Sequence, residues 1–113
     1  LIVDQHNEQR EDFLYVSDCV WANLLVLRND TCNGVYNLGF GHSVQITTII
    51  TILKELINYR QTPTFNIIPE CENRDIYLDT QKIQQAVGWK PTVNLFEGLE
   101  QTVTYLRKNQ RPR

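Results

Sequence analysis

The sequence of 113 residues contains no methionine, so it shows no translation start, and it opens abruptly on Leu1. We expect it to be a piece of a longer protein. Cysteine is scarce as well: Cys19, Cys32 and Cys71 lie far apart, and any pair would leave one over. Reduced thiols in a cytoplasmic protein are the expectation. One thiolate among carboxylates near Cys71 matches no zinc-ligand spacing, so no metal is expected there.

Strong charge of one sign and long apolar runs are also missing. The net charge is -2, which leaves no basic face to attract nucleic acid. The apolar stretch "ITTIITILKELI" is interrupted by threonines, Lys54 and Glu55, well short of the roughly 20 residues that span a bilayer. We therefore expect neither nucleic acid nor membrane as a partner. The basic residues near the C-terminus are interpreted as a solvated end: Arg107, Lys108, Arg111 and Arg113.

Strand and helix patterns alternate along the rest of the chain. Aromatic and branched runs predict strands at 12–16, 34–38 and 65–68. Apolar residues at helical spacing predict helices at 18–28, 46–59, 80–87 and 95–108. This alternation is typical of an α/β protein, and the length fits one domain over 1–113.

Several polar residues and one glycine predict where the helices begin and end. Ile83, Ala86 and Val87 are expected to form the buried stripe of the third helix. The expected end signals are Ser17 or Asp18 for the first helix, Asp79 and Gly88 for the third, and an Asn94–Glu97 capping box for the last.

The loop "GFG" follows a predicted strand and precedes a helix, as in a dinucleotide-binding fingerprint. The third glycine is missing, however, and no acidic residue follows about 20 residues later at a strand end. A tight strand-to-helix turn at Gly39 and Gly41 is favoured, with phosphate contact as the alternative. His42 and His6 have no carboxylate or nucleophile at local spacing, so no catalytic triad is predicted.

Four motifs occur in an order that resembles a known family: "REDFLYVSDCVWANLLVL", "GVYNLGFGHSVQITTIITIL", "DIYLDTQKIQQAVGWKP" and "TVNLFEGLEQTVTYLR". The resemblance is to the C-terminal part of extended short-chain dehydrogenases/reductases, the NAD-dependent epimerase/dehydratase family acting on nucleotide sugars, such as UDP-glucose 4-epimerase. It covers about Gln9 to Arg107. It implies an α/β fold that is the substrate-binding part of a Rossmann-type enzyme and lacks the N-terminal NAD-binding core.

The resemblance also implies what the chain does not carry. Family members use a Tyr-x-x-x-Lys pair in the N-terminal region, and none of the tyrosines here has lysine four residues later: Tyr15, Tyr36, Tyr59, Tyr77 and Tyr105. No catalysis is expected from this chain alone, and no cofactor in it; NAD(P) is expected for the full-length parent. The missing Rossmann domain is an expected partner, and the resemblance suggests a homo-oligomer.

Two arginines are the candidates for binding the diphosphate of a nucleotide sugar, because the guanidinium fork pairs with phosphate oxygens. In the family an arginine commonly precedes the "DF" pair; here Glu11 stands there and Arg10 is one residue earlier. A second arginine usually lies before the "Y-D" segment, where Arg74 is displaced in "PECENRD". Both are therefore weighed against ordinary surface arginines.

Two functions are compatible with these residues and this resemblance. The first is a fragment of a nucleotide-sugar epimerase or dehydratase that grips the nucleotide diphosphate. The second is a stand-alone, non-catalytic binding or interaction module that kept the substrate half. In either case the first helix is apolar around most of its circumference, and self-association is expected.

Overall fold

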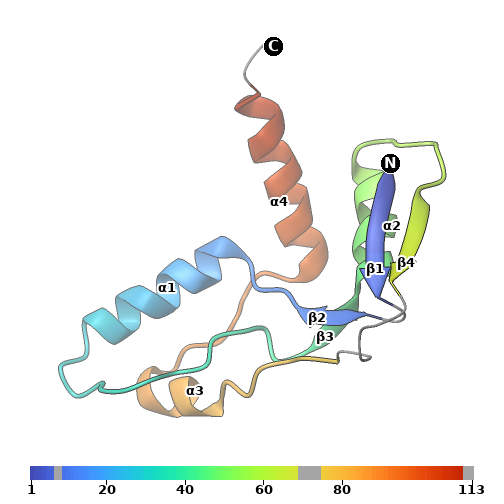
Figure 1. Ribbon diagram of the computed structural model, residues 1–113. Helices are drawn as coiled ribbons and strands as arrows, with labels where there is room; N and C mark the ends of the chain where they lie inside the picture. Colours follow the sequence, from blue (N-terminus) through green and yellow to red (C-terminus); the bar gives the residue numbers. More distant parts are fainter. Residues whose placement is uncertain (7–8, 69–74, 111–113) are drawn as a thin grey trace.

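The computed structural model describes residues 1–6, 9–68 and 75–110 (Figure 1). Its elements, in chain order, are β1 (Ile2–His6), β2 (Arg10–Asp12), α1 (Val16–Leu27), β3 (Ser43–Gln45), α2 (Ile46–Leu56), β4 (Thr64–Ile68), α3 (Gln81–Val87) and α4 (Leu95–Lys108). None of the helices in these ranges is both long and apolar enough to cross a bilayer.

The strands form two separate pairs. β1 and β4 are parallel, with Ile2 opposite Thr64. β2 and β3 are antiparallel, with Arg10 opposite Gln45. Helix α2 follows β3 directly and, in Figure 1, stands beside the β1–β4 pair. In the same view, the short β2–β3 ladder lies between this strand pair and helices α1, α3 and α4.

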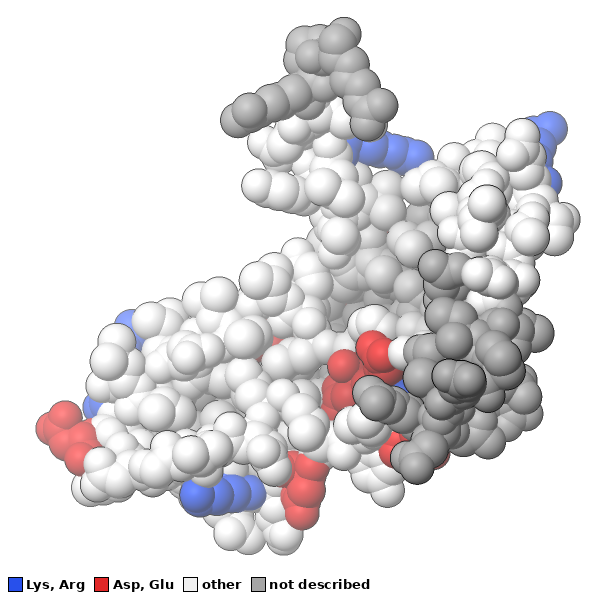
Figure 2. All heavy atoms as spheres, in the orientation of Figure 1, with Lys and Arg blue, Asp and Glu red and all other residues white. Residues whose placement is uncertain are grey.

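The largest fully buried side chain, Trp89, marks the hydrophobic core beneath α1. It packs with Ala22 of α1 and Ile83 of α3, and its indole Nε1 donates a hydrogen bond to the carbonyl oxygen of Asp18 at 3.0 Å. Partly buried residues extend this core: Leu14, Leu25, Val26, Tyr36, Leu38 and Val87. Figure 2 shows that the visible face over α1 carries few charged side chains.

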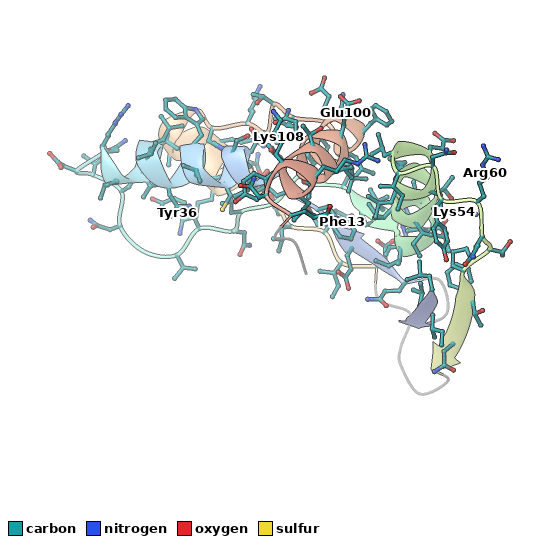
Figure 3. All side chains as sticks on the ribbon, turned by 90° about the horizontal axis from the view of Figure 1, so that it is seen from above. Phe13, Tyr36, Lys54, Arg60, Glu100 and Lys108 are labelled. Atoms are coloured by element: carbon teal, nitrogen blue, oxygen red, sulfur yellow. The ribbon has the colours of Figure 1, made fainter. Side chains whose placement is uncertain are left out.

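The molecule is extended. Its radius of gyration is 17.0 Å, whereas a compact domain of about 100 residues has a value of about 13 Å. Figure 3 shows the cause: Tyr36 lies at the α1 end, and Lys54 and Arg60 lie at the opposite, α2 end. The elements around α1 and those around α2 therefore do not share one compact core, and many large apolar side chains stay exposed.

The helices predicted from the sequence are confirmed, with shifted ends. α4 begins and ends as predicted, α3 begins one residue later and α1 two residues earlier. α2 ends at Leu56 rather than near residue 59, because Asn58 adopts a left-handed conformation with φ of 54°.

The strand predictions are partly wrong. The strand at 65–68 is confirmed as β4. The strand predicted at 12–16 lies earlier, as β2, and ends at Asp12, because α1 already starts at Val16. The strand predicted at 34–38 is not formed: none of these residues belongs to an assigned strand, and no strand in the described ranges pairs with them. β1 and β3 were not predicted, because their pairing depends on residues far away in the sequence.

The predicted helix ends have mixed outcomes. Gly88 closes α3 with φ of 69°, as predicted, and the Asn94 side chain accepts a hydrogen bond from the Glu97 amide at 2.9 Å, which is one half of the predicted capping box. Asp79 precedes the N-cap, Thr80, and accepts from the Gln81 amide.

The first helix and the stripe of the third differ from the predictions. The N-cap of α1 is Tyr15, with no side-chain cap, so Ser17 and Asp18 are not caps. The Asp18 carboxylate instead accepts hydrogen bonds from the amides of Thr92 and Val93. Ile83 is buried and Val87 packs against the core, but Ala86 is exposed, because seven residues present only a narrow face to α1.

Candidate functional site

Arg10 is positioned by the β2–β3 ladder. Its Nε donates a hydrogen bond to the Ser43 hydroxyl at 3.1 Å, and its Nη2 donates to the Ser43 carbonyl at 3.1 Å. Ser43 belongs to β3, so both contacts cross the ladder. The guanidinium is therefore held in one orientation by the strand next to it.

Asp75 joins Arg10 and Ser43 from the segment that leads to α3. Its Oδ1 lies 3.8 Å from Arg10 Nε and accepts a hydrogen bond from the Ser43 hydroxyl. The Arg10 and Asp75 side chains are 39% and 60% exposed, so water screens this pair and it adds little to stability. Exposure also leaves the guanidinium accessible to a dissolved anion.

A groove of about 400 Å³ opens beside the guanidinium. It is lined by Arg10, Gly41, His42, Ser43 and Tyr77. The groove adjoins a larger, polar pocket of about 560 Å³ and shares three lining residues with it. The lining of the larger pocket is Phe40, Gly41, His42, Tyr77, Leu78, Asp79, Thr80, Gln81 and Gln84.

The carboxylate of Asp12 holds the walls of this groove together. It accepts hydrogen bonds from the amides of Phe40 at 2.7 Å, Gly41 at 2.9 Å and Leu78 at 3.1 Å. A Cβ at Gly39 would lie 2.7 Å from an Asp12 oxygen, so glycine is needed there. Because Asp12 already takes two amides of the glycine loop, this loop is a pinned turn, and these amides do not fit the phosphates of a dinucleotide.

Asp18 plays a comparable part away from the groove. Its buried carboxylate accepts from the amides of Thr92 and Val93 at 3.0–3.1 Å and from the Thr92 hydroxyl at 2.9 Å. This carboxylate fastens α1 to the segment that enters α4. Asp18 is thus a structural residue.

The other residues considered from the sequence differ in their position relative to the groove. Side chains alternate along a strand, so Glu11 lies on the opposite face of β2 from Arg10, and its carboxylate accepts from the Gln9 side chain. Glu11 therefore does not face the groove beside Arg10. Arg74 falls outside the residues that the structure describes. His42 lines the groove, with its ring centroid 6.0 Å from that of Phe40.

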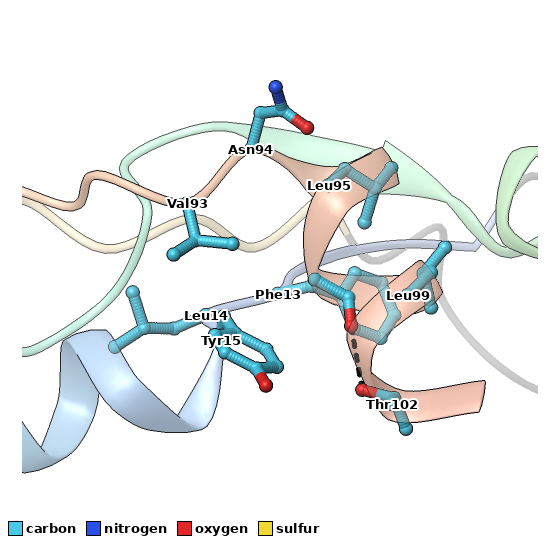
Figure 4. A pocket seen from close by; sticks show the side chains of 9 residues that line it. Phe13, Leu14, Tyr15, Val93, Asn94, Leu95, Leu99 and Thr102 are labelled. Atoms are coloured by element: carbon cyan, nitrogen blue, oxygen red, sulfur yellow. Dashed lines mark hydrogen bonds between the residues drawn. The ribbon is translucent and has the colours of Figure 1, made fainter. Parts of the chain in front are cut away.

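A second hollow is apolar and smaller, about 180 Å³ (Figure 4). Phe13, Leu14 and Tyr15 face Leu95 and Leu99 of α4 across it. The Thr102 hydroxyl at its edge is already donating to the Gly98 carbonyl. This hollow offers no charged donor, so the Arg10 groove is the better candidate for an anionic ligand.

Arg10 was named as a candidate from the sequence, but the residues that hold it were not identified there. Ser43 and Asp75 gain their role only from the β2–β3 ladder and from an isolated bridge between residues 10 and 75. Across the described residues, no group of three or more His, Cys, Asp or Glu side chains could hold a metal ion.

Comparisons with known proteins agree on one family. No family model matches the chain. A Methanocaldococcus jannaschii protein described as a proposed UDP-glucose 4-epimerase is 33% identical over 97% of this chain and 35% of its own length. The mouse dTDP-D-glucose 4,6-dehydratase is 31% identical over 89% of this chain and 30% of its own length.

A solved structure supports the same relationship. The UDP-glucose 4-epimerase of Thermotoga maritima, determined with UDP-glucose, matches with a TM-score of 0.85 and 34% identity. The match covers 96% of this chain and 35% of that one.

These matches define an α/β chain of the extended short-chain dehydrogenase/reductase class. It is a C-terminal portion of a member of the NAD-dependent epimerase/dehydratase family and spans about a third of the length of the relatives it matches.

Proposed function

We propose that this chain contributes to binding a nucleotide-diphosphate sugar within an NAD-dependent epimerase or dehydratase. The observation that carries the proposal is the solvent-accessible Arg10 guanidinium, held by Ser43 at the mouth of a groove of about 400 Å³. Clefts of about 300–1,000 Å³ are the usual size for small-molecule sites. The ligand class comes from the relatives, among them the Thermotoga maritima epimerase determined with UDP-glucose.

The chemistry of the groove suits a diphosphate. A guanidinium gives charge-assisted hydrogen bonds to phosphate oxygens. Asp75 is negative but largely exposed, and its Oδ1 already accepts a hydrogen bond from the Ser43 hydroxyl. Arg74, adjacent to Asp75 in the sequence, is proposed as the second phosphate ligand.

Catalysis and cofactor binding are assigned to the rest of a full-length parent. NAD(P) is the proposed cofactor there, together with a Rossmann domain that packs on this chain and forms the other wall of the cleft. The pinned glycine loop of this chain does not fit a dinucleotide. The affinity of the chain alone is therefore expected to be weak, because half of the cleft is missing.

Calorimetric titration of UDP, GDP and dTDP tests this function. Arg10→Ala and Arg74→Ala should each weaken binding at least about tenfold, because charge-assisted bonds are lost. Lys90→Ala, an exposed cation outside the groove, should leave the affinity unchanged. Binding should also weaken as salt rises. Equal losses for Arg10→Ala and Lys90→Ala would remove Arg10 from the site, and no heat with any nucleotide would refute the function.

A further inference from the structure

The imidazole of His42 lies in the Arg10 groove without a polar partner among the described residues. The side chain is exposed and lines both the groove and the larger polar pocket beside it. Its contact within the described part of the chain is with the Phe40 ring, and neither of its nitrogens forms a hydrogen bond to another described residue. Both nitrogens are therefore open to a dissolved anion.

The backbone on either side of His42 is held in place. The Gly41 amide before it donates a hydrogen bond to the Asp12 carboxylate at 2.9 Å. The Ser43 hydroxyl and carbonyl after it accept hydrogen bonds from the Arg10 guanidinium, each at 3.1 Å. The fold thus carries the imidazole next to the guanidinium, and both line one groove.

The net charge of the groove depends on this imidazole. Arg10 is the one permanent cation among the described lining residues, and the Asp75 carboxylate lies 3.8 Å from its Nε. The other titratable groups around His42 are two carboxyl groups and a phenol: Asp12, Asp79 and Tyr77. In model peptides carboxyl groups titrate near about pH 4 and phenols near about pH 10, whereas imidazole titrates near about pH 6.5. Among the described residues, a second positive charge for a dianion therefore comes from a protonated His42.

We infer that protonated His42 binds the phosphates beside Arg10, so that the groove holds its anion more tightly as pH falls. The inference rests on the proposed function and adds a proton to the binding equilibrium. An imidazolium attracts a phosphate and a neutral imidazole does not, so binding favours the protonated form and takes up protons. The affinity is therefore highest below the titration range of the histidine and falls as pH rises through that range.

Calorimetric titration of the 113-residue chain with UDP-glucose at about pH 5.5 and about pH 8 measures this linkage. Both phosphate groups of UDP-glucose are esterified, so the charge of the ligand is the same under the two conditions. The wild type should bind about five- to tenfold more tightly at the lower pH, the gain expected for one exposed charge-assisted hydrogen bond. Titrations near neutral pH in buffers of different ionisation enthalpy should also show proton uptake on binding.

The two histidines of the sequence provide a matched pair of variants. His42→Gln should abolish both the tighter binding at the lower pH and the proton uptake, whereas His6→Gln should keep both. The inference is refuted if the wild type binds equally under the two conditions, or if the gain survives in His42→Gln. If UDP-glucose gives no heat at either pH, or if Arg10→Ala has no effect, the proposed function itself fails.

Discussion

Single residues of the "DF" and "SD" motifs hold the fold by accepting several backbone amides at once. Asp12 and Asp18 each do so for segments that follow much later in the chain. The sequence predicted no such role for Asp12 and offered Asp18 only as an alternative to Ser17 for the helix cap. Their partners could not be predicted, because they are backbone groups whose position depends on the finished fold.

Replacing Asp12 should destabilise the chain measurably. Asp12→Asn keeps the shape but offers one acceptor oxygen and directs an NH₂ group at backbone amides, so the free energy of unfolding should fall by about 2 kcal/mol. Urea denaturation measures this change. Asp30→Asn, an exposed control, should stay within about 0.5 kcal/mol of the wild type. A loss no larger than that of the control would show that Asp12 does not hold the loop.

Tyr36 is expected to titrate at unusually high pH. Two causes raise the pKa of Tyr36 above its ordinary value of 10.0. The larger is a hydrogen bond with the Cys32 side chain, and the next is desolvation. A raised folded-state pKa favours the neutral phenol, so this stabilisation is fully present below the unfolded pKa and is lost as pH rises through the folded pKa. NMR titration of the Tyr36 ring should show the high pKa, and Cys32→Ala should lower it. An unchanged pKa in that variant would contradict the assigned cause.

Among the elements, the helices were predictable, whereas of the strands in the described residues only β4 lies where the sequence predicts it. The repeat of apolar residues and the Asn94 and Gly88 signals identify α2, α3 and α4, since these depend on neighbours in the sequence. β2 and β3 are three residues each and exist only through their pairing across about 30 residues. Arg10 was therefore found as a candidate by resemblance, whereas its orientation toward Ser43 required the structure.

The end of α3 gives a clean test of backbone conformation. Gly88 has φ of 69°, and an added Cβ would meet no atom within 4 Å, so only backbone strain opposes a side chain there. Gly88→Ala should lower the free energy of unfolding by about 1 kcal/mol. Gly88→Asn should cost less, because asparagine tolerates this conformation better. Thermal denaturation of both variants measures the difference, and equal stabilities for Gly88→Ala and the wild type would contradict this account.

For the whole molecule, the dominant feature is apolar surface that the chain does not cover. Along α1, Val16, Val20, Leu24 and Leu27 follow one another at spacings of four, four and three residues, and Val16 and Leu27 are 64% and 80% exposed. Residues at this spacing share one side of a helix. Together with the large radius of gyration, this stripe indicates that the chain does not bury its own apolar surface in one core.

Self-association should follow from this stripe. Sedimentation velocity of the 113-residue chain should show species larger than a monomer as concentration rises, because large exposed apolar patches promote association. The double variant Val20→Glu with Leu27→Glu should shift the distribution toward monomer, since both side chains are already exposed. A monodisperse wild-type monomer at high concentration would refute this prediction.

The Arg10 groove is proposed to receive the phosphates of a nucleotide sugar. The most direct measurement is a map of backbone amide shifts by ¹⁵N NMR as UDP-glucose is added to the chain. Phosphate binding there should give the largest shifts at Arg10, Gly41, Ser43 and Tyr77, on the walls of the groove. Shifts concentrated instead around the apolar hollow at Leu99, or no shifts at saturating ligand, would contradict it.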